Sequence, residues 1–291
     1  MEMILKEKLE EAGICFQNQY EILYNNQCIV IPVKIEGELY FFKFLDKKNY
    51  NKMCLEVDIV NKLNENGIKV HKYYNLQGKY VFKDENMCFY GTKCVEDENM
   101  ILNHNYDILC DVILNIAKMH NYLLNISSFE GEKVLEKSND YIELNKFFES
   151  NRKFIYENGF GFIVNSVLQN GFETSHYSFI HYDLNFKNIM IKNNRFSGFI
   201  DFTDFKIGYL EDDLGKFFQN VVYLKNITDV DIYNLIHLYN QNSLTKISMK
   251  NLKTSIIYRI IYRYFCALNE NAINEEYKNQ TQKILKKINN L

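Results

Sequence analysis

The most informative part of this chain reads FIHYDLNFKNIMI, from Phe179 to Ile191. It contains the pattern His-x-Asp-x4-Asn and ends in an apolar run that is typical of a short strand. A second apolar run, Phe199 to Phe202, follows the turn residues Asn193-Asn194 and includes Asp201. The two runs predict a β-hairpin, with a tight polar loop at its start and Asp201 on the partner strand.

Three oxygen-bearing side chains of this region form a pattern that suits phosphoryl transfer. That reaction needs a carboxylate beside the attacking hydroxyl, and metal ions that bridge the phosphates. Asp183 and Asn188 can share one loop because they are five residues apart, and Asp201 can complete a metal site. Such ligands suit Mg²⁺, which takes one or two carboxylates from a protein and its other ligands from water and phosphate.

The same residues resemble the catalytic core of the aminoglycoside phosphotransferase and choline kinase superfamily, which is related to protein kinases. In that superfamily the catalytic loop reads His-Gly-Asp-x4-Asn, the metal loop reads Ile-Asp-Phe/Trp, and Asp-Leu follows twelve residues after the metal Asp. Asp213-Leu214 has this spacing from Asp201. The resemblance implies a catalytic base or hydroxyl-orienting residue at Asp183, Mg²⁺ ligands at Asn188 and Asp201, and structural support of the loop by His181 and Asp213.

The resemblance extends to the first half of the chain. The stretch Phe41 to Leu45 is similar to the family's third strand, whose lysine contacts the α- and β-phosphates, and Glu56 opens an apolar helical run as the family's ion-pair glutamate does. The stretch Thr92 to Val95 falls where the family's hinge offers backbone groups to the nucleotide base. The implied cofactor-binding residues are therefore Lys43 paired with Glu56, together with Lys93 and Val95, with ATP or GTP as co-substrate and Mg²⁺ as cofactor.

Two departures from the family keep a second function open. Tyr182 replaces the usual Gly of the catalytic loop, and the first hairpin, Tyr24 to Gln27, has no glycine. The resemblance implies a kinase that phosphorylates a hydroxyl of an aminoglycoside-like antibiotic or a small polar metabolite. The alternative, which the two departures favour, is a catalytically weak or inactive nucleotide-binding or structural protein of the spore-coat type. The presence of all five motif residues favours the kinase.

The distribution of strand and helix patterns predicts an α+β fold, and the resemblance implies that this fold is protein-kinase-like. Residues 1–95 would form a small antiparallel nucleotide-binding lobe with one helix, ended by Gly67, and residues 96–291 a larger, mainly helical catalytic and substrate-binding lobe. Strands are expected at Phe16 to Tyr24, Cys28 to Ile35, Leu39 to Leu45, Lys72 to Lys83 and Met87 to Val95, with Pro32 at an edge or a bulge. Helices are expected at about 108–123, 130–170, 212–224, 229–242 and 251–290.

Composition excludes several classes of protein. A formal net charge of −3 gives no sign of a nucleic-acid binder. The apolar stretch Ile256 to Leu268 contains Arg259 and Arg263, so no membrane span is expected. The seven cysteines form no CxxC pair, which favours reduced thiols and a cytoplasmic protein. The partner that the resemblance implies is a small-molecule hydroxyl acceptor.

Three polar residues outside the motifs have a structural and a functional interpretation. Glu211 and Asp212 could face a cationic substrate, or they could lie in the first turn of a helix, where acids favour the dipole. His120 could be catalytic, but its place in an apolar helical pattern favours packing in the core.

Overall fold

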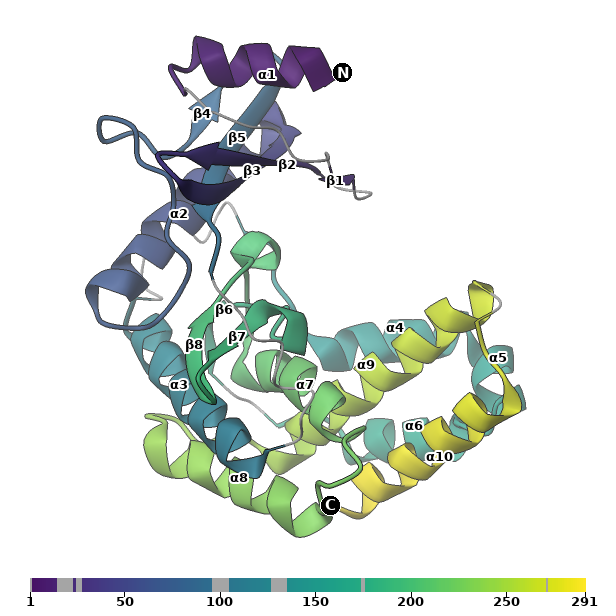
Figure 1. Ribbon diagram of the computed structural model, residues 1–291. Coiled ribbons are helices and arrows are strands. Elements are labelled where there is room, and N and C mark those ends of the chain that lie inside the picture. The colour runs from purple at the N-terminus through teal and green to yellow at the C-terminus, as the bar shows by residue number, and fades with distance from the viewer. Residues whose placement is uncertain are drawn as a thin grey trace. The chain divides into compact units, whose positions relative to one another are not determined.

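The structure is a computed structural model that describes residues 2–14, 23–24, 28–95, 105–126, 135–173, 176–270 and 272–291 (Figure 1). The chain divides into two units. The sheet unit contains Met1–Glu98, Met190–Lys192 and Ser197–Thr203, and the helical unit contains Asn99–Ile189, Asn193–Phe196 and Asp204–Leu291. The predicted α+β class, with a small antiparallel sheet followed by a helical part, is confirmed.

An antiparallel sheet in the order β1-β2-β3-β5-β4 forms the centre of the sheet unit. Its strands are β1 (Leu23–Tyr24), β2 (Ile29–Ile35), β3 (Glu38–Asp46), β4 (Phe82–Lys83) and β5 (Met87–Lys93). Glu36 and Gly37 join β2 to β3 with φ angles of 51° and 84°, the positive values of a tight hairpin turn. In the described part of the chain, β1 pairs only with Ile29 and Val30, so Pro32 lies beyond this pairing, as expected of a residue without an N–H.

The strand expected over Lys72 to Lys83 is largely wrong. Only Phe82–Lys83 forms a strand, and Leu76 and Lys79 form a single bridge around the predicted turn at Gln77-Gly78. The backbone before that turn forms an isolated antiparallel bridge between Tyr73 and Thr92, in which Tyr74 N–H donates to Gly91 O and Lys93 N–H donates to Lys72 O. Residues 16–22 of the first expected strand, residues 25–27 of the first hairpin and Cys15 lie outside the described residues.

Helices α1 (Glu2–Glu11) and α2 (Tyr50–Glu65) pack on the sheet (Figure 1). Leu5 and Leu9 of α1 share a buried cluster with Phe42 and Phe89. Helix α1 is not predicted by the sequence, because the charged residues around Leu5 and Leu9 obscure their four-residue spacing. Since successive side chains of a strand point to opposite faces, Lys43 points away from this cluster, next to its register partner Tyr90.

The helical unit contains α3 (Tyr106–Ile126), α4 (Asp140–Ser150), α5 (Arg152–Glu157), α6 (Gly161–Asn170), α7 (Leu210–Val221), α8 (Asp229–Asn242), α9 (Met249–Asn269) and α10 (Glu275–Asn290). The helical region expected over 130–170, which the structure describes from residue 135, consists of three helices. The helical backbone is interrupted at Asn151 and again at Gly159, where φ is 75°. The helical region expected over 251–290 consists of two helices, α9 and α10. Helix α10 begins after Asn274, whose side chain accepts a hydrogen bond from Tyr277 N–H.

Two short strand pairs lie outside the five-stranded sheet. Strands β6 (Tyr177–Ile180) and β9 (Lys206–Tyr209) pair antiparallel, a sheet that the sequence does not predict because each strand has only four residues. Strands β7 (Ile189–Lys192) and β8 (Arg195–Phe199) form the predicted hairpin, with φ angles of 52° and 57° at Asn193 and Asn194.

The position expected for Asp201 needs a correction. Strand β8 ends at Phe199, and a 3₁₀ turn begins at Phe202. Asp201 therefore lies after the strand, not on it, with a φ angle of 58°. Positive φ is uncommon for an Asp and breaks the extended backbone that a strand needs.

Helices α7 and α9 cross at Gly215. A Cβ atom added to Gly215 would lie 1.9 Å from Ser255 Oγ and 2.6 Å from Ser255 Cβ. Ser255 is buried and donates to Asp140 Oδ2, so it cannot easily move away. The close approach of the two helices therefore depends on glycine at this position.

We expect Gly215→Ala to destabilise the protein by about 1–3 kcal/mol, the usual cost of overpacking a core. Elsewhere in a helix the same change would stabilise by about 1 kcal/mol, so the sign of the effect is diagnostic. Urea unfolding would measure it, with Gly198→Ala as the control, since a Cβ there would make no contact closer than 3.4 Å. Unchanged or higher stability of Gly215→Ala would contradict the close approach.

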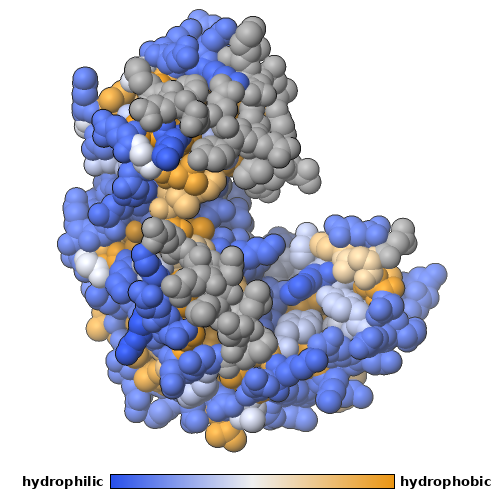
Figure 2. Space-filling view, viewed as in Figure 1, coloured by the Kyte–Doolittle hydropathy of each residue, from blue (hydrophilic) through white to orange (hydrophobic). Residues whose placement is uncertain are grey.

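The helices carry polar outer faces. Hydrophilic side chains cover most of the visible surface over α8 and α10 (Figure 2). Within the described residues, no helix is both long and apolar enough to span a bilayer.

Candidate phosphoryl-transfer site

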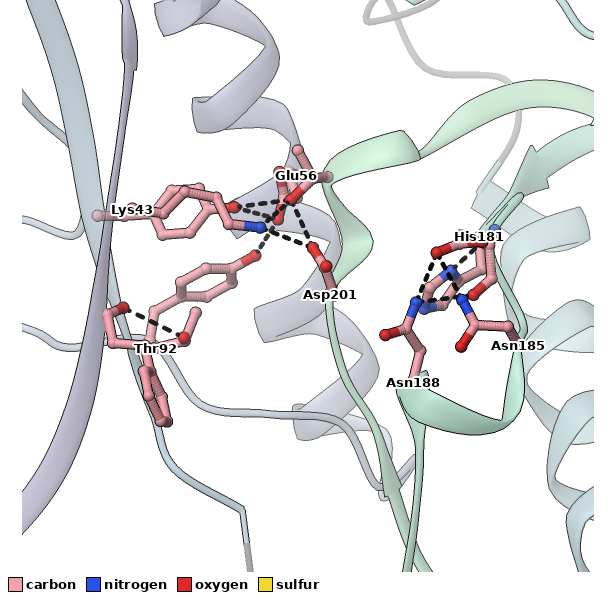
Figure 3. Close-up of polar contacts among 12 residues, drawn as sticks. Lys43, Glu56, Thr92, His181, Asn185, Asn188 and Asp201 are labelled. Carbon is pink, nitrogen blue, oxygen red and sulfur yellow. Dashed lines mark hydrogen bonds and ion pairs between the residues drawn. The ribbon is translucent and has the colours of Figure 1, made fainter. Parts of the chain in front are cut away.

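Lys43, Asp201 and Thr203 form a polar cluster in the sheet unit (Figure 3). Lys43 Nζ lies 2.7 Å from Asp201 Oδ1 and donates to Thr203 Oγ1 over 2.6 Å. Thr203 Oγ1 in turn donates to the same Asp201 oxygen over 2.6 Å. The predicted phosphate-binding lysine and the predicted metal-binding aspartate are therefore in direct contact.

The expected ion pair between Lys43 and Glu56 is not formed in the described structure. Glu56 is buried on α2, and its Oε1 accepts from the hydroxyls of Tyr73, over 2.7 Å, and Tyr90, over 2.9 Å. Burial raises the pKa of Glu56, while the charge of Lys43 and the two tyrosine hydrogen bonds oppose this rise. Two tyrosines therefore satisfy the carboxyl group that Lys43 was expected to bind, and Lys43 binds Asp201 instead.

Lys43 nevertheless stays protonated. Burial lowers the pKa of its ammonium group, but the nearby negative charges of Asp201 and Glu56 outweigh burial, so the net shift is upward. A charged, partly desolvated ammonium group is the kind of group that binds phosphate oxygens strongly.

A cavity of about 260 Å³ adjoins this cluster within the sheet unit. Its lining includes Lys43, Tyr90, Thr92, Lys93, Val95 and Asp201. The two predicted hinge residues differ in what they can offer a ligand. Lys93 N–H donates to Lys72 O and its ammonium group pairs with Glu38, whereas Val95 N–H has no acceptor in the described part of the chain. Val95 is therefore the better candidate for a backbone contact with a base.

The catalytic-loop residues form a second cluster, in the helical unit (Figure 3). Asp183 Oδ2 accepts from the side-chain amides of Asn185 and Asn188, each over 2.8 Å. Asp183 Oδ1 lies 2.9 Å from Lys216 Nζ. Both oxygens of the predicted catalytic carboxylate are thus held by named donors.

The ionisation of Asp183 reflects opposing effects. Burial raises its pKa, but the charge and hydrogen bond of Lys216 and the hydrogen bond from Asn185 outweigh it, and the pKa is lowered overall. Asp183 is therefore a carboxylate at neutral pH, able to accept a hydrogen bond from a hydroxyl group.

The loop that carries Asp183 is held by Asp213 on α7. Asp213 Oδ2 accepts from His181 N–H over 3.0 Å, and Oδ1 accepts from Tyr182 N–H over 2.7 Å. His120 Nε2 lies 3.0 Å from Asp213 Oδ2, and its Nδ1 lies 2.8 Å from the Tyr239 hydroxyl. His120 is thus a buried residue behind the loop, as the packing interpretation predicts. These contacts support the bracing roles proposed for His181 and Asp213.

Asn188 has the chemistry of a Mg²⁺ ligand. Its side-chain N–H groups donate to the Asp183 backbone oxygen, over 2.9 Å, and to Asp183 Oδ2. Since the amide nitrogen makes these hydrogen bonds, the carboxamide oxygen stays available for a metal ion, and it accepts no hydrogen bond from the described residues. A carboxamide oxygen and the carboxylate of Asp201 are hard ligands of the type that Mg²⁺ takes from proteins.

Tyr182 occupies the loop position where glycine is usual. Its φ angle is 66°, a left-handed conformation that costs a non-glycine residue free energy. Its ring contacts two cations, with Lys206 Nζ 4.2 Å and the Arg259 guanidinium carbon 4.7 Å from the ring centroid. The aromatic contacts offset the backbone strain, so the tyrosine fits the loop.

Glu211 and Asp212 do not face solvent. Both are buried in the first turn of α7, where Glu211 Oε1 accepts from Ser248 N–H and the Asp212 backbone oxygen accepts from Arg259. The structure therefore favours the helix-start interpretation over the cationic-substrate one.

The structure brings the predicted residues together in two groups. Lys43, Glu56 and Asp201 lie in the sheet unit, and Asp183, Asn188, His181 and Asp213 lie in the helical unit. Sequence reasoning missed Thr203, the two tyrosines on Glu56, and Lys216. Of these residues, only Lys216 could have been found from the sequence. It follows Asp213 by three residues, so the two side chains are expected on the same face of a helix.

Several solved structures have a similar fold. The amicoumacin kinase hAmiN, in complex with AMP-PNP, Ca²⁺ and Ami, is 14% identical with a TM-score of 0.69, and the match covers 100% of this chain and 96% of that one. APH(2″)-IIia in its GDP and kanamycin complex is 12% identical over 98% of both chains, with a TM-score of 0.67. Choline kinase LicA from Streptococcus pneumoniae is 16% identical over 100% of this chain and 99% of that chain, with a TM-score of 0.56. These likenesses confirm the predicted kinase-like fold.

No curated protein matched the chain. The model of the phosphotransferase enzyme family, APH, matches residues 36–226, a stretch that contains both clusters from Lys43 to Asp213. Since this match covers more than half of the chain, the protein belongs to the APH phosphotransferase enzyme family.

Proposed function

We propose that this phosphotransferase moves the γ-phosphoryl group of ATP or GTP to a hydroxyl group of a small molecule. The observation that carries the proposal is the arrangement around Asp183. An ionised carboxylate is held by Asn185, Asn188 and Lys216, and Asn188 keeps its carboxamide oxygen for a metal. A carboxylate that orients a hydroxyl, beside a metal ligand, is what phosphoryl transfer requires of a protein.

Each candidate residue has a separate task in this proposal. The cavity beside Thr92 and Val95 would receive the nucleotide, and the charged Lys43 would bind its phosphates. Asn188 and Asp201 would hold Mg²⁺, which, when bound, would neutralise charge on the phosphate oxygens. Asp183 would accept the hydrogen bond, and finally the proton, of the attacking hydroxyl. Residues 1–95 would then be the nucleotide-binding lobe and residues 96–291 the catalytic and acceptor-binding lobe.

The acceptor belongs to a class that the similar structures illustrate. Those proteins include kinases of amicoumacin and choline, and one bound to kanamycin. We propose an aminoglycoside-like antibiotic or a small polar metabolite with a free hydroxyl as the acceptor. The six cysteines within the described residues form no disulfide among themselves, which supports the proposed cytoplasmic location.

A weak or inactive nucleotide-binding protein is the second candidate, because Tyr182 stands directly before Asp183 where the family has glycine, with a left-handed φ angle of 66°. Thermal-shift measurements with ATP and GTP, with and without Mg²⁺, separate binding from chemistry. Nucleotide at about 100 times its dissociation constant adds about 2.7 kcal/mol of stability. We expect this stabilisation to need Mg²⁺, and nucleotide turnover to rise with one acceptor from a panel of kanamycin, spectinomycin, amicoumacin and choline.

Each outcome of this experiment decides between the candidates. Mg²⁺-dependent stabilisation with acceptor-stimulated turnover supports the kinase. Stabilisation without acceptor-stimulated turnover supports the binding protein. In that case Asp183→Asn should hydrolyse nucleotide no more slowly than the wild type. A folded protein that no nucleotide stabilises would contradict both.

A further inference from the structure

Lys216 contacts the proposed catalytic carboxylate, although no motif assigns it a role. Its Nζ lies 2.9 Å from Asp183 Oδ1, in an ion pair whose side chains are 27% and 24% exposed. Lys216 and Asp213 are three residues apart on α7, so they lie on the same face of the helix. One helical turn thus binds the loop twice, through the backbone at His181 and Tyr182 and through the side chain of Asp183.

We propose that Lys216 is a positioning residue for phosphoryl transfer, which fixes the Asp183 carboxylate for the acceptor hydroxyl. The inference rests on the proposed function, since it gives Lys216 a task in the same reaction. Asn185 and Asn188 bind only Oδ2, so without Lys216 no described side chain holds Oδ1. The carboxylate could then rotate away from the hydroxyl that it must orient.

The chemical step leaves the proton of Lys216 in place. The acceptor oxygen forms a bond to the γ-phosphorus, and the bond from that phosphorus to the β–γ bridging oxygen breaks, with its electron pair leaving on the nucleoside diphosphate. The hydroxyl proton passes to Asp183. Lys216 takes no part in the proton transfer and only holds the carboxylate in place through its contact with Oδ1.

Lys216→Met and Lys216→Arg test the proposal, with Lys225→Met as the matched control because Lys225 is exposed and has no ion pair among the described residues. The assay is nucleotide turnover with Mg²⁺, using the stimulating acceptor or, failing that, water. We expect Lys216→Met to lower turnover by roughly 10- to 100-fold, since misplacing a reacting group by about 1 Å can cost 10²-fold. Lys216→Arg should recover part of the loss, and Lys225→Met should match the wild type.

A comparison of kcat with KM distinguishes positioning from simple support of the fold. Asp183 is proposed to contact the acceptor and not the nucleotide, so Lys216→Met should lower kcat while the KM for Mg-nucleotide stays close to the wild-type value. An unchanged kcat, or turnover equal to that of Lys225→Met, would overturn the proposal.

A measurement without turnover separates failure of this inference from failure of the proposed function. Side-chain amide NMR of Asn185 and Asn188, which both donate to Asp183 Oδ2, reports how the carboxylate is held. We expect these two amide resonances to shift in Lys216→Met and to stay unchanged in Lys225→Met. A wild-type protein without turnover would reject the kinase, while unshifted amide resonances in Lys216→Met would reject the role of Lys216. If Lys216→Met does not fold, the resonances in Lys216→Arg decide, and we expect them to remain close to the wild-type positions.

Discussion

Asp183→Asn should lower turnover by roughly 10²–10⁴-fold, the usual contribution of a positioned base. The change removes the negative charge that would accept the hydroxyl proton. It also disturbs the hydrogen bonds, because Asp183 accepts from amide donors at Oδ2 and from Lys216 at Oδ1. An Asn has only one acceptor oxygen, so its amide group must face a donor on one side.

Steady-state turnover beside Mg-nucleotide affinity tests this expectation. The affinity should change little, because Asp183 is proposed to contact the acceptor and not the nucleotide. Asp107→Asn, at an exposed position on α3, is the matched control and should keep wild-type turnover. Near-normal turnover in Asp183→Asn would remove this residue from the reaction and leave the nucleotide-binding protein as the better description.

Asp201→Ala should abolish the part of nucleotide affinity that depends on Mg²⁺. The change removes a proposed metal ligand and also the carboxylate that binds Lys43 over 2.7 Å. Calorimetry with ATP or GTP, in Mg²⁺ and in chelator, would measure both affinities. We expect the two affinities of the variant to be equal, whereas those of the wild type differ.

Thr203→Val separates the two effects of the Asp201→Ala change, which are the loss of a proposed metal ligand and the loss of a contact to Lys43. It removes the hydroxyl that bonds both Lys43 and Asp201 but keeps the carboxylate. We expect Thr203→Val to retain Mg²⁺-dependent affinity, and Asp58→Ala, on the exposed side of α2, to behave as the wild type. A full metal effect in Asp201→Ala would show that the ion is held elsewhere.

The sequence predicts the local features of this fold well. Hairpin turns at Glu36-Gly37 and Asn193-Asn194, and the end of α2 before Gly67, each depend on a few adjacent residues. The sheet of β6 and β9 is not predictable in this way. Its two strands are brief and lie far apart in the chain, so their pairing depends on tertiary contacts.

The same distinction holds for the site. The spacing of Asp183, Asn188 and Asp201 is a local signal, and it identifies the loop residues. The partner of Glu56 is not local, since Tyr73 and Tyr90 reach it from later segments of the chain. A family pattern that names a lysine and a glutamate cannot reveal two tyrosine hydroxyls that satisfy the glutamate first.

The crossing of α7 and α9 links the thermal stability of the protein to its proposed catalysis. Gly215 lies between Asp213 and Lys216, the two residues that bind the loop of Asp183. Its close contact with Ser255 determines how α7 packs against α9. If Asp213 and Lys216 have the proposed roles, the same contact also determines the orientation of the Asp183 carboxylate. Laboratory evolution toward heat tolerance, with selection for turnover maintained, should therefore accept replacements along both helices and conserve this one glycine.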